Sequence, residues 1–115
     1  MGRSQISRGG NPARLPSHLQ AVLGVGRSGL DGIADRGEKY NATDVVDAKL
    51  PMRRFLIAGL GNGEALVAIE HGGRGWRLDV ALFSDVDQDA SVKRRWRLFE
   101  SPQTLRELLK RISIP

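Results

Sequence analysis

Two adjacent residues, Glu70 and His71, carry the side chains of a proton shuttle, because an imidazole titrates near neutral pH and can exchange protons beside a carboxylate. Asp79, on the next predicted strand, is a third group that chain reversal could bring near. Glu70 and His71 fall within a predicted strand, however, and consecutive side chains of a strand point to opposite faces. The other histidine, His18, lies far away in the sequence. We therefore assign no catalytic residue and predict that the protein is not an enzyme.

The segment from Gly24 to Gly29 (GVGRSG) matches the G-x-G-x-x-G pattern of dinucleotide-binding loops, with Asp47 downstream as a candidate ribose ligand. Such a loop needs a strand before it and a stable helix after it, because the helix N-terminus holds the pyrophosphate. Here a predicted helix precedes the loop, and further glycines interrupt the segment that follows. The pattern therefore indicates a plain glycine loop, and we predict no cofactor.

Asp85, Asp87 and Asp89 alternate as the first ligands of a calcium loop do. The sixth position of such a loop would be Ala90 instead of glycine, and the twelfth would be Trp96 instead of glutamate. The pattern therefore predicts an acidic, solvated loop at a hairpin tip and no metal site. Acidic side chains at such a tip also oppose pairing between sheet edges.

A basic segment with one aromatic residue, Lys93 to Arg97 (KRRWR), has the composition of surfaces that bind phosphates and stack on bases. Strand alternation places Lys93, Arg95 and Arg97 on the exposed face and turns Trp96 toward the core. Arg77 on the preceding strand extends the same cationic strip. We therefore name these four basic residues as the candidate binding surface for a protein or nucleic-acid partner.

The chain has 115 residues and no cysteine, which corresponds to one domain without disulfides, a thiol nucleophile or a cysteine-ligated metal. Its longest apolar runs, Phe55 to Leu60 and Ala65 to Ile69, are far shorter than the roughly 18 residues that cross a bilayer. Nothing at the N-terminus resembles a secretion signal. We therefore expect a cytoplasmic protein with no membrane partner.

The formal net charge of +5 is unevenly distributed along the chain. Residues 1–30 carry +4, residues 31–90 carry −4 and residues 91–115 carry +5. Much of the excess therefore lies in the N-terminal arm, and the total alone does not indicate a nucleic-acid partner.

Four apolar segments with strand-forming residues are separated by turn signals, of which Asn62-Gly63 is a typical two-residue hairpin. Three short connections in a row predict an antiparallel four-stranded meander over about 53–99. The expected strands are 53–60, 65–71, 76–83 and 92–99. In the third and fourth, one face is apolar and the other polar, which indicates a core on one side and solvent on the other.

Two helices complete the predicted α+β fold. Leu105, Leu108, Leu109 and Ile112 form an apolar stripe in a helix over about 102–112, which begins at Ser101-Pro102 and covers the apolar face of the sheet. A short helix over about 17–23, with Ser17 as N-cap, is expected beside it or at one end of the sheet. Residues 1–14 are predicted to be a disordered basic arm, and residues 15–115 to form the single domain.

These features favour a small non-enzymatic protein-interaction domain, of the kind seen in inhibitors and immunity proteins that occlude a partner enzyme. The opposite charges of the middle and end of the chain suit a protein with complementary patches. The alternative is a nucleic-acid-binding protein that uses the Arg-rich arm and the strip from Lys93 to Arg97. Homodimerisation by pairing of sheet edges is a further alternative.

Overall fold

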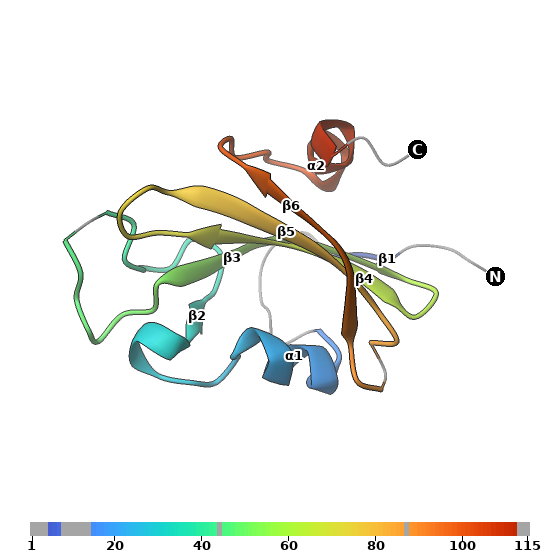
Figure 1. Ribbon diagram of the computed structural model, residues 1–115, viewed down its shortest axis with the longest axis horizontal. Helices are drawn as coiled ribbons and strands as arrows, with labels where there is room; N and C mark the ends of the chain where they lie inside the picture. Colours follow the sequence, from blue (N-terminus) through green and yellow to red (C-terminus); the bar gives the residue numbers. More distant parts are fainter. Residues whose placement is uncertain (1–4, 8–14, 44, 87, 113–115) are drawn as a thin grey trace.

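The computed structural model describes residues 5–7, 15–43, 45–86 and 88–112 (Figure 1). The elements in chain order are β1 (Gln5–Ser7), α1 (Ser17–Leu23), the 3-10 turn η2 (Gly29–Asp31), β2 (Ile33–Ala34), β3 (Arg53–Gly61), β4 (Glu64–His71), β5 (Arg77–Ser84), β6 (Ser91–Leu98) and α2 (Leu105–Ile112). The α+β class predicted from the sequence is confirmed.

The sheet has the strand order β1-β3-β4-β5-β6, and β2 pairs in parallel with the start of β3. The predicted antiparallel meander is confirmed as β3 to β6, with each strand paired to the next. The prediction of a four-stranded, wholly antiparallel sheet is wrong, because β1 and β2 add short strands to β3 and make the sheet mixed. β6 is an edge strand of the sheet.

The two helices lie on opposite faces of the sheet (Figure 1). On the first face, Leu19 and Leu23 of α1 share a buried cluster with Phe55, Val67 and Phe83 of the strands. On the second face, α2 contributes to a separate buried cluster, which contains Leu56, Ile57, Leu78, Val80, Leu108 and Ile112. The expectation that one face of the sheet is open to solvent is therefore wrong. The expectation that α1 lies beside α2 or at one end of the sheet is also wrong, because α1 packs on the opposite face.

This two-sided burial explains the continuous apolar run in β3. Phe55 and Ala58 belong to the cluster on the α1 side, whereas Leu56 and Ile57 both belong to the cluster on the α2 side. A register shift between Phe55 and Ile57 places these two adjacent residues on the same face. A strand that is buried on both faces carries apolar residues at successive positions, so its sequence does not alternate between apolar and polar residues.

α1 ends where the sequence predicts, but it is capped and buried differently. Gly24 takes a left-handed conformation (φ 88°), and its N–H donates to the carbonyls of Gln20 and Ala21. The N-cap is Pro16, without a side-chain hydrogen bond, so the expected cap at Ser17 is wrong. Val22 is 53% exposed and lies outside the buried cluster that contains Leu19 and Leu23.

α2 begins three residues later than predicted. The hydroxyl of Thr104 accepts a hydrogen bond from the N–H of Glu107 (3.1 Å), and the carboxylate of Glu107 accepts one from the N–H of Gln103 (2.8 Å). This arrangement resembles a capping box, which replaces the predicted start at Ser101-Pro102. Leu108 and Ile112 are buried, but Leu109 is 41% exposed.

The prediction of a disordered arm over residues 1–14 is wrong for Gln5–Ser7, which pair antiparallel with β3. The rest of that range lies outside the described residues. No helix in the described part of the chain is both long and apolar enough to cross a membrane.

Candidate functional site

A register shift in β6 divides the predicted cationic strip between the two faces of the sheet. Val92 pairs with Phe83, but Arg94 pairs with Leu82, so Lys93 is the extra residue of a β-bulge. Beyond the bulge the pairing is regular, and Arg95 lies opposite Ala81. The predicted alternation, which placed Lys93 with Arg95 and Arg97, is therefore wrong for Lys93.

Lys93 and Arg94 lie on the α2 side of the sheet. The ammonium of Lys93 is 2.7 Å from the carboxylate of Glu64 on β4. The guanidinium of Arg94 lies over the ring of Trp96, 4.9 Å from its centroid. Trp96 is partly buried and packs on the α2-side cluster, as predicted. The Trp96 ring therefore contacts both the core and the guanidinium of Arg94.

Arg77, Arg95 and Arg97, three of the four predicted binding residues, meet around Asp79 on the α1 side. Arg77 Nε lies 3.0 Å from Asp79 Oδ1, and Arg97 Nε lies 3.7 Å from the same oxygen. Arg95 is exposed and has no ion pair or hydrogen bond among the described residues. Within the described residues, this surface therefore has one carboxylate shared by two guanidiniums and a third guanidinium without a counter-ion.

A cleft of about 240 Å³ lies beside these residues, where α1 stops short of covering β5 and β6. Apolar side chains from α1, β4, β5 and β6 line it, among them Val22, Leu23, Ile69, Ala81, Phe83 and Val92. Arg53, Asp79 and Arg95 supply its charged groups. The cleft is thus an apolar slot with an excess of positive charge.

Arg53 joins the cleft to the loop after α1. Its guanidinium donates to the carbonyls of Asp31 (3.1 Å) and Gly32 (3.3 Å). Burial, and then the positive charge of Arg27, lower the pKa of Arg53 from its ordinary value. Backbone carbonyls offset the desolvation of this guanidinium less completely than a carboxylate would.

The acidic loop between β5 and β6 is exposed at Asp85 and Asp89, while Asp87 lies outside the described residues. The carbonyl of Asp85 accepts hydrogen bonds from the N–H groups of Gln88 and Ala90. Val86, within the loop predicted to be solvated, is instead buried in the α1-side cluster. No group of three or more His, Asp or Glu side chains that would hold a metal occurs in the described part of the chain.

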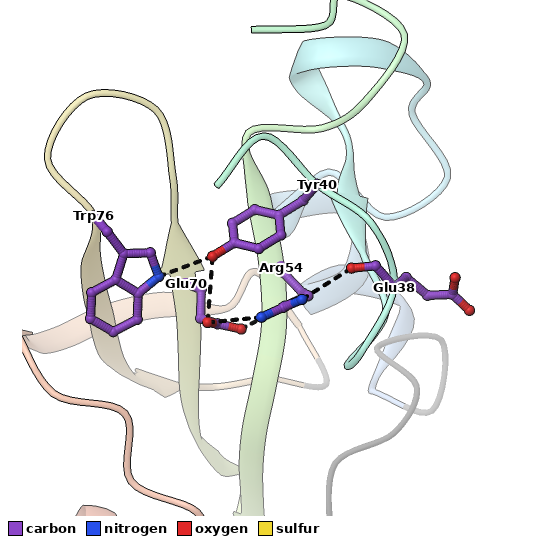
Figure 2. Close-up of polar contacts among 5 residues, drawn as sticks. All are labelled: Glu38, Tyr40, Arg54, Glu70 and Trp76. Carbon is purple, nitrogen blue, oxygen red and sulfur yellow. Dashed lines mark hydrogen bonds and ion pairs between the residues drawn. The ribbon is translucent and has the colours of Figure 1, made fainter. Parts of the chain in front are cut away.

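Glu70 does not act with His71 but belongs to a polar network with Tyr40, Arg54 and Trp76 (Figure 2). Its carboxylate accepts two hydrogen bonds from Arg54, at 2.7 and 3.1 Å, and a longer one from the Tyr40 hydroxyl, at 3.4 Å. The Trp76 ring N–H donates to that hydroxyl at 3.0 Å. His71 Nδ1 instead lies 3.1 Å from the carbonyl of Gly72.

This network fastens the 38–41 segment to the sheet. Arg54 also donates to the carbonyl of Glu38, and its guanidinium lies 4.4 Å from the centroid of the Tyr40 ring. Burial, followed by the charge of Glu70, raises the pKa of Tyr40. Hydrogen bonding to Glu70 raises the pKa of Arg54. Every polar group of Glu70 is therefore engaged within the fold, which indicates a structural role.

The G-x-G-x-x-G segment is a loop without the dinucleotide-binding context. Gly24 ends α1, and the segment leads into the short turn η2 instead of a full helix. Asp47, the candidate ribose ligand, is an exposed loop residue: its N–H donates to the side chain of Asn41 at 2.7 Å, and its carboxylate accepts the N–H of Lys49 at 2.9 Å. The expectation that this segment is a glycine loop after a helix is confirmed.

Sequence reasoning did not predict the cleft. The cleft requires α1 to pack on the face of the sheet from which Val92 and Arg95 of β6 project. A local signal of the bulge in β6 is Arg94, a charged residue in alternation with the apolar residues Trp96 and Leu98. Comparisons of the chain with protein-family models, with curated proteins and with solved structures found no match.

Proposed function

We propose that the protein is a non-enzymatic interaction domain that binds an acidic, extended segment of a partner protein along β6. The observation that supports this proposal best is the position and charge of β6. It is the outermost strand of its side of the sheet, and its exposed cations lie on both faces. They are Lys93 and Arg94 on the α2 side and Arg95 and Arg97 on the α1 side.

An outermost strand offers backbone N–H and C=O groups to an added strand, which gives affinity without a deep pocket. The side chains of an added strand alternate between the two faces of the sheet. Acidic residues at successive positions of that strand would therefore meet cations on both faces. An inhibitory role follows where such a segment borders the active site of a partner enzyme.

The geometry favours a protein over a nucleic acid. Stacking on bases requires an accessible ring face, and Trp96 packs on the core and lies under Arg94. Carboxylates also stand among the cations, with Asp79 between Arg77 and Arg97 and Glu64 beside Lys93. A continuous phosphate backbone would be repelled by these carboxylates, whereas a peptide can place its acids selectively.

The same charges disfavour homodimerisation through β6. Antiparallel pairing of two copies of this strand would place the basic side chains of both copies along one seam. Like charges opposite one another destabilise a strand pair. We therefore expect β6 to pair with a chemically different chain.

The test is fluorescence anisotropy with a labelled peptide of glutamate and threonine residues in which glutamates stand at successive positions, so that they reach both faces of an added strand. A lysine and threonine peptide and a single-stranded oligothymidylate serve as comparison ligands, at an ionic strength of about 0.15 M. The variant Arg95→Glu/Arg97→Glu removes the cations of the α1 side. Its matched control, Lys39→Glu/Lys49→Glu, makes the same change in net charge at two exposed loop residues.

The proposal predicts saturable binding of the acidic peptide that the Arg95→Glu/Arg97→Glu variant weakens by more than about tenfold. The loop variant should change the affinity by less than about threefold. Equal weakening by both variants, or preference for the oligonucleotide, would contradict the proposal. The second outcome would favour the nucleic-acid alternative.

A further inference from the structure

The cleft between α1 and β6 has apolar walls that remain partly open. Val22 of α1 is 53% exposed and Val92 of β6 is 39% exposed, and both line the cleft. Its floor is formed by buried or partly buried side chains, including Ile69, Ala81 and Phe83. An apolar group that enters the cleft would remove these walls and the floor from water. This burial of apolar surface lowers the free energy of the complex.

The size of the cleft limits what can fill it. Pockets for cofactors and drug-sized molecules measure about 300–1,000 Å³. The cleft, at about 240 Å³, lies below that range. It is therefore suited to an aliphatic side chain and not to a complete cofactor.

The charges at the cleft specify the neighbours of that side chain. Arg95 lines the cleft and has no ion-pair partner among the described residues. Arg97, two residues further along the same face, shares Asp79 with Arg77. A partner strand that places an apolar residue in the cleft beside Arg95 would therefore bind most favourably if it carried an acidic residue two positions away, on the same face.

We propose that the acidic partner segment carries one aliphatic residue of the size of leucine, isoleucine or methionine, and that this side chain inserts between α1 and β6. This inference rests on the proposed function and adds to it a specificity pocket. Backbone pairing and acidic residues would supply general affinity for β6. The inserted side chain would then distinguish one acidic segment from another.

The test compares two acidic peptides of equal charge, one with a central leucine and one with serine in its place. Each is titrated against the full chain and against two cleft variants. Ala81→Leu fills the cleft from β5, and Val22→Ser makes one wall polar. Val46→Ser is the matched control, because Val46 is 50% exposed and lies in a loop away from the cleft. Val22 itself is exposed, so Val22→Ser tests the pocket even where Ala81→Leu perturbs folding.

The native chain should bind the leucine peptide at least about tenfold more tightly than the serine peptide. Both cleft variants should reduce this ratio to within about threefold, while Val46→Ser should leave it unchanged. Equal affinity of the two peptides for the native chain would overturn the specificity pocket and leave acidic binding at β6 intact. A leucine preference that survives both cleft variants would also overturn it. Failure of both peptides to bind would overturn the proposed function and this inference together.

Discussion

The carboxylate of Glu70 accepts two hydrogen bonds from the guanidinium of Arg54 on the neighbouring strand, at 2.7 and 3.1 Å. The Lys93–Glu64 pair has the same shortest distance of 2.7 Å but a different environment. The side chains of Arg54 and Glu70 are 26% and 7% exposed, whereas those of Lys93 and Glu64 are 52% and 39% exposed. These two pairs therefore separate the effect of burial from that of distance.

Glu70→Gln is expected to lower the free energy of unfolding by about 2–4 kcal/mol, because it leaves a partly buried guanidinium without its counter-charge. Glu64→Gln should cost less than about 1 kcal/mol, since both partners are solvated. Urea unfolding followed by tryptophan fluorescence measures both values. Equal losses in the two variants would contradict a structural role for the buried pair.

Tyr40 should ionise at higher pH in the folded protein than in the unfolded chain. Burial and the nearby charge of Glu70 raise its pKa above the ordinary value of 10.0. Tyr40 is the one tyrosine of the sequence, so the absorbance of tyrosinate reports on it directly. Glu70→Gln should lower this pKa but leave it above the value in urea, because burial remains. A native titration that coincides with the one in urea would contradict the described environment.

The same shift predicts how stability changes with pH. Because the folded-state pKa is raised, the native state binds the phenolic proton more tightly than the unfolded state does. The contribution of Tyr40 to stability is therefore fully present below about pH 10 and is lost as the pH rises through the folded-state pKa. Tyr40→Phe should show a shallower fall in stability above pH 10 than the native chain. Identical alkaline slopes would show that Tyr40 does not contribute.

Gly72, the residue after β4, lies directly against the backbone of Asn41. A Cβ atom there would lie 1.8 Å from the carbonyl oxygen of Asn41, so backbone must move. Gly72→Ala is expected to cost at least about 3 kcal/mol and to expose the N–H of Gly73, which donates to that carbonyl. Gly75→Ala is the control: its Cβ would meet no atom within 4 Å, and its φ of 80° predicts a cost of about 1–2 kcal/mol. Equal costs would contradict the close approach.

Thr104 caps α2 through its hydroxyl, which accepts the N–H of Glu107. Thr104→Ala should destabilise the protein by about 1 kcal/mol, and Thr104→Ser should retain most of the stability. Thermal unfolding of the two variants provides the comparison. A Ser101→Ala variant should have little effect, because the helix does not begin there. The reverse order of effects would restore the start predicted from Ser101-Pro102.

The meander was predictable because its signals are local. Apolar runs predict the first two strands and alternation the last two, all to within a residue or two of the observed bounds, and Asn62-Gly63 predicts the first hairpin. Both residues of that turn have positive φ, 52° and 74°, as a two-residue hairpin of this type requires. The sequence offers two starts for α2, Ser101-Pro102 and the capping pattern from Thr104 to Glu107, and the structure has the second.

The two bulges were not predictable from alternation, and they determine which polar residues meet. Regular pairing from the first hairpin would place Arg54 opposite His71, but the shift near Leu56 places it opposite Glu70. The bulge at Lys93 similarly moves that residue to the α2 side. The buried network and the division of the cations therefore both depend on irregularities that tertiary packing selects.

Amide hydrogen exchange of β6 is the most direct test of acidic strand addition to this edge. The account predicts that the glutamate and threonine peptide slows exchange by at least about tenfold at those N–H groups of Ser91–Leu98 that do not donate to β5. Exchange in the central strands β3 and β4 should stay unchanged. Protection confined to other parts of the chain, or binding without any protection in β6, would contradict the account.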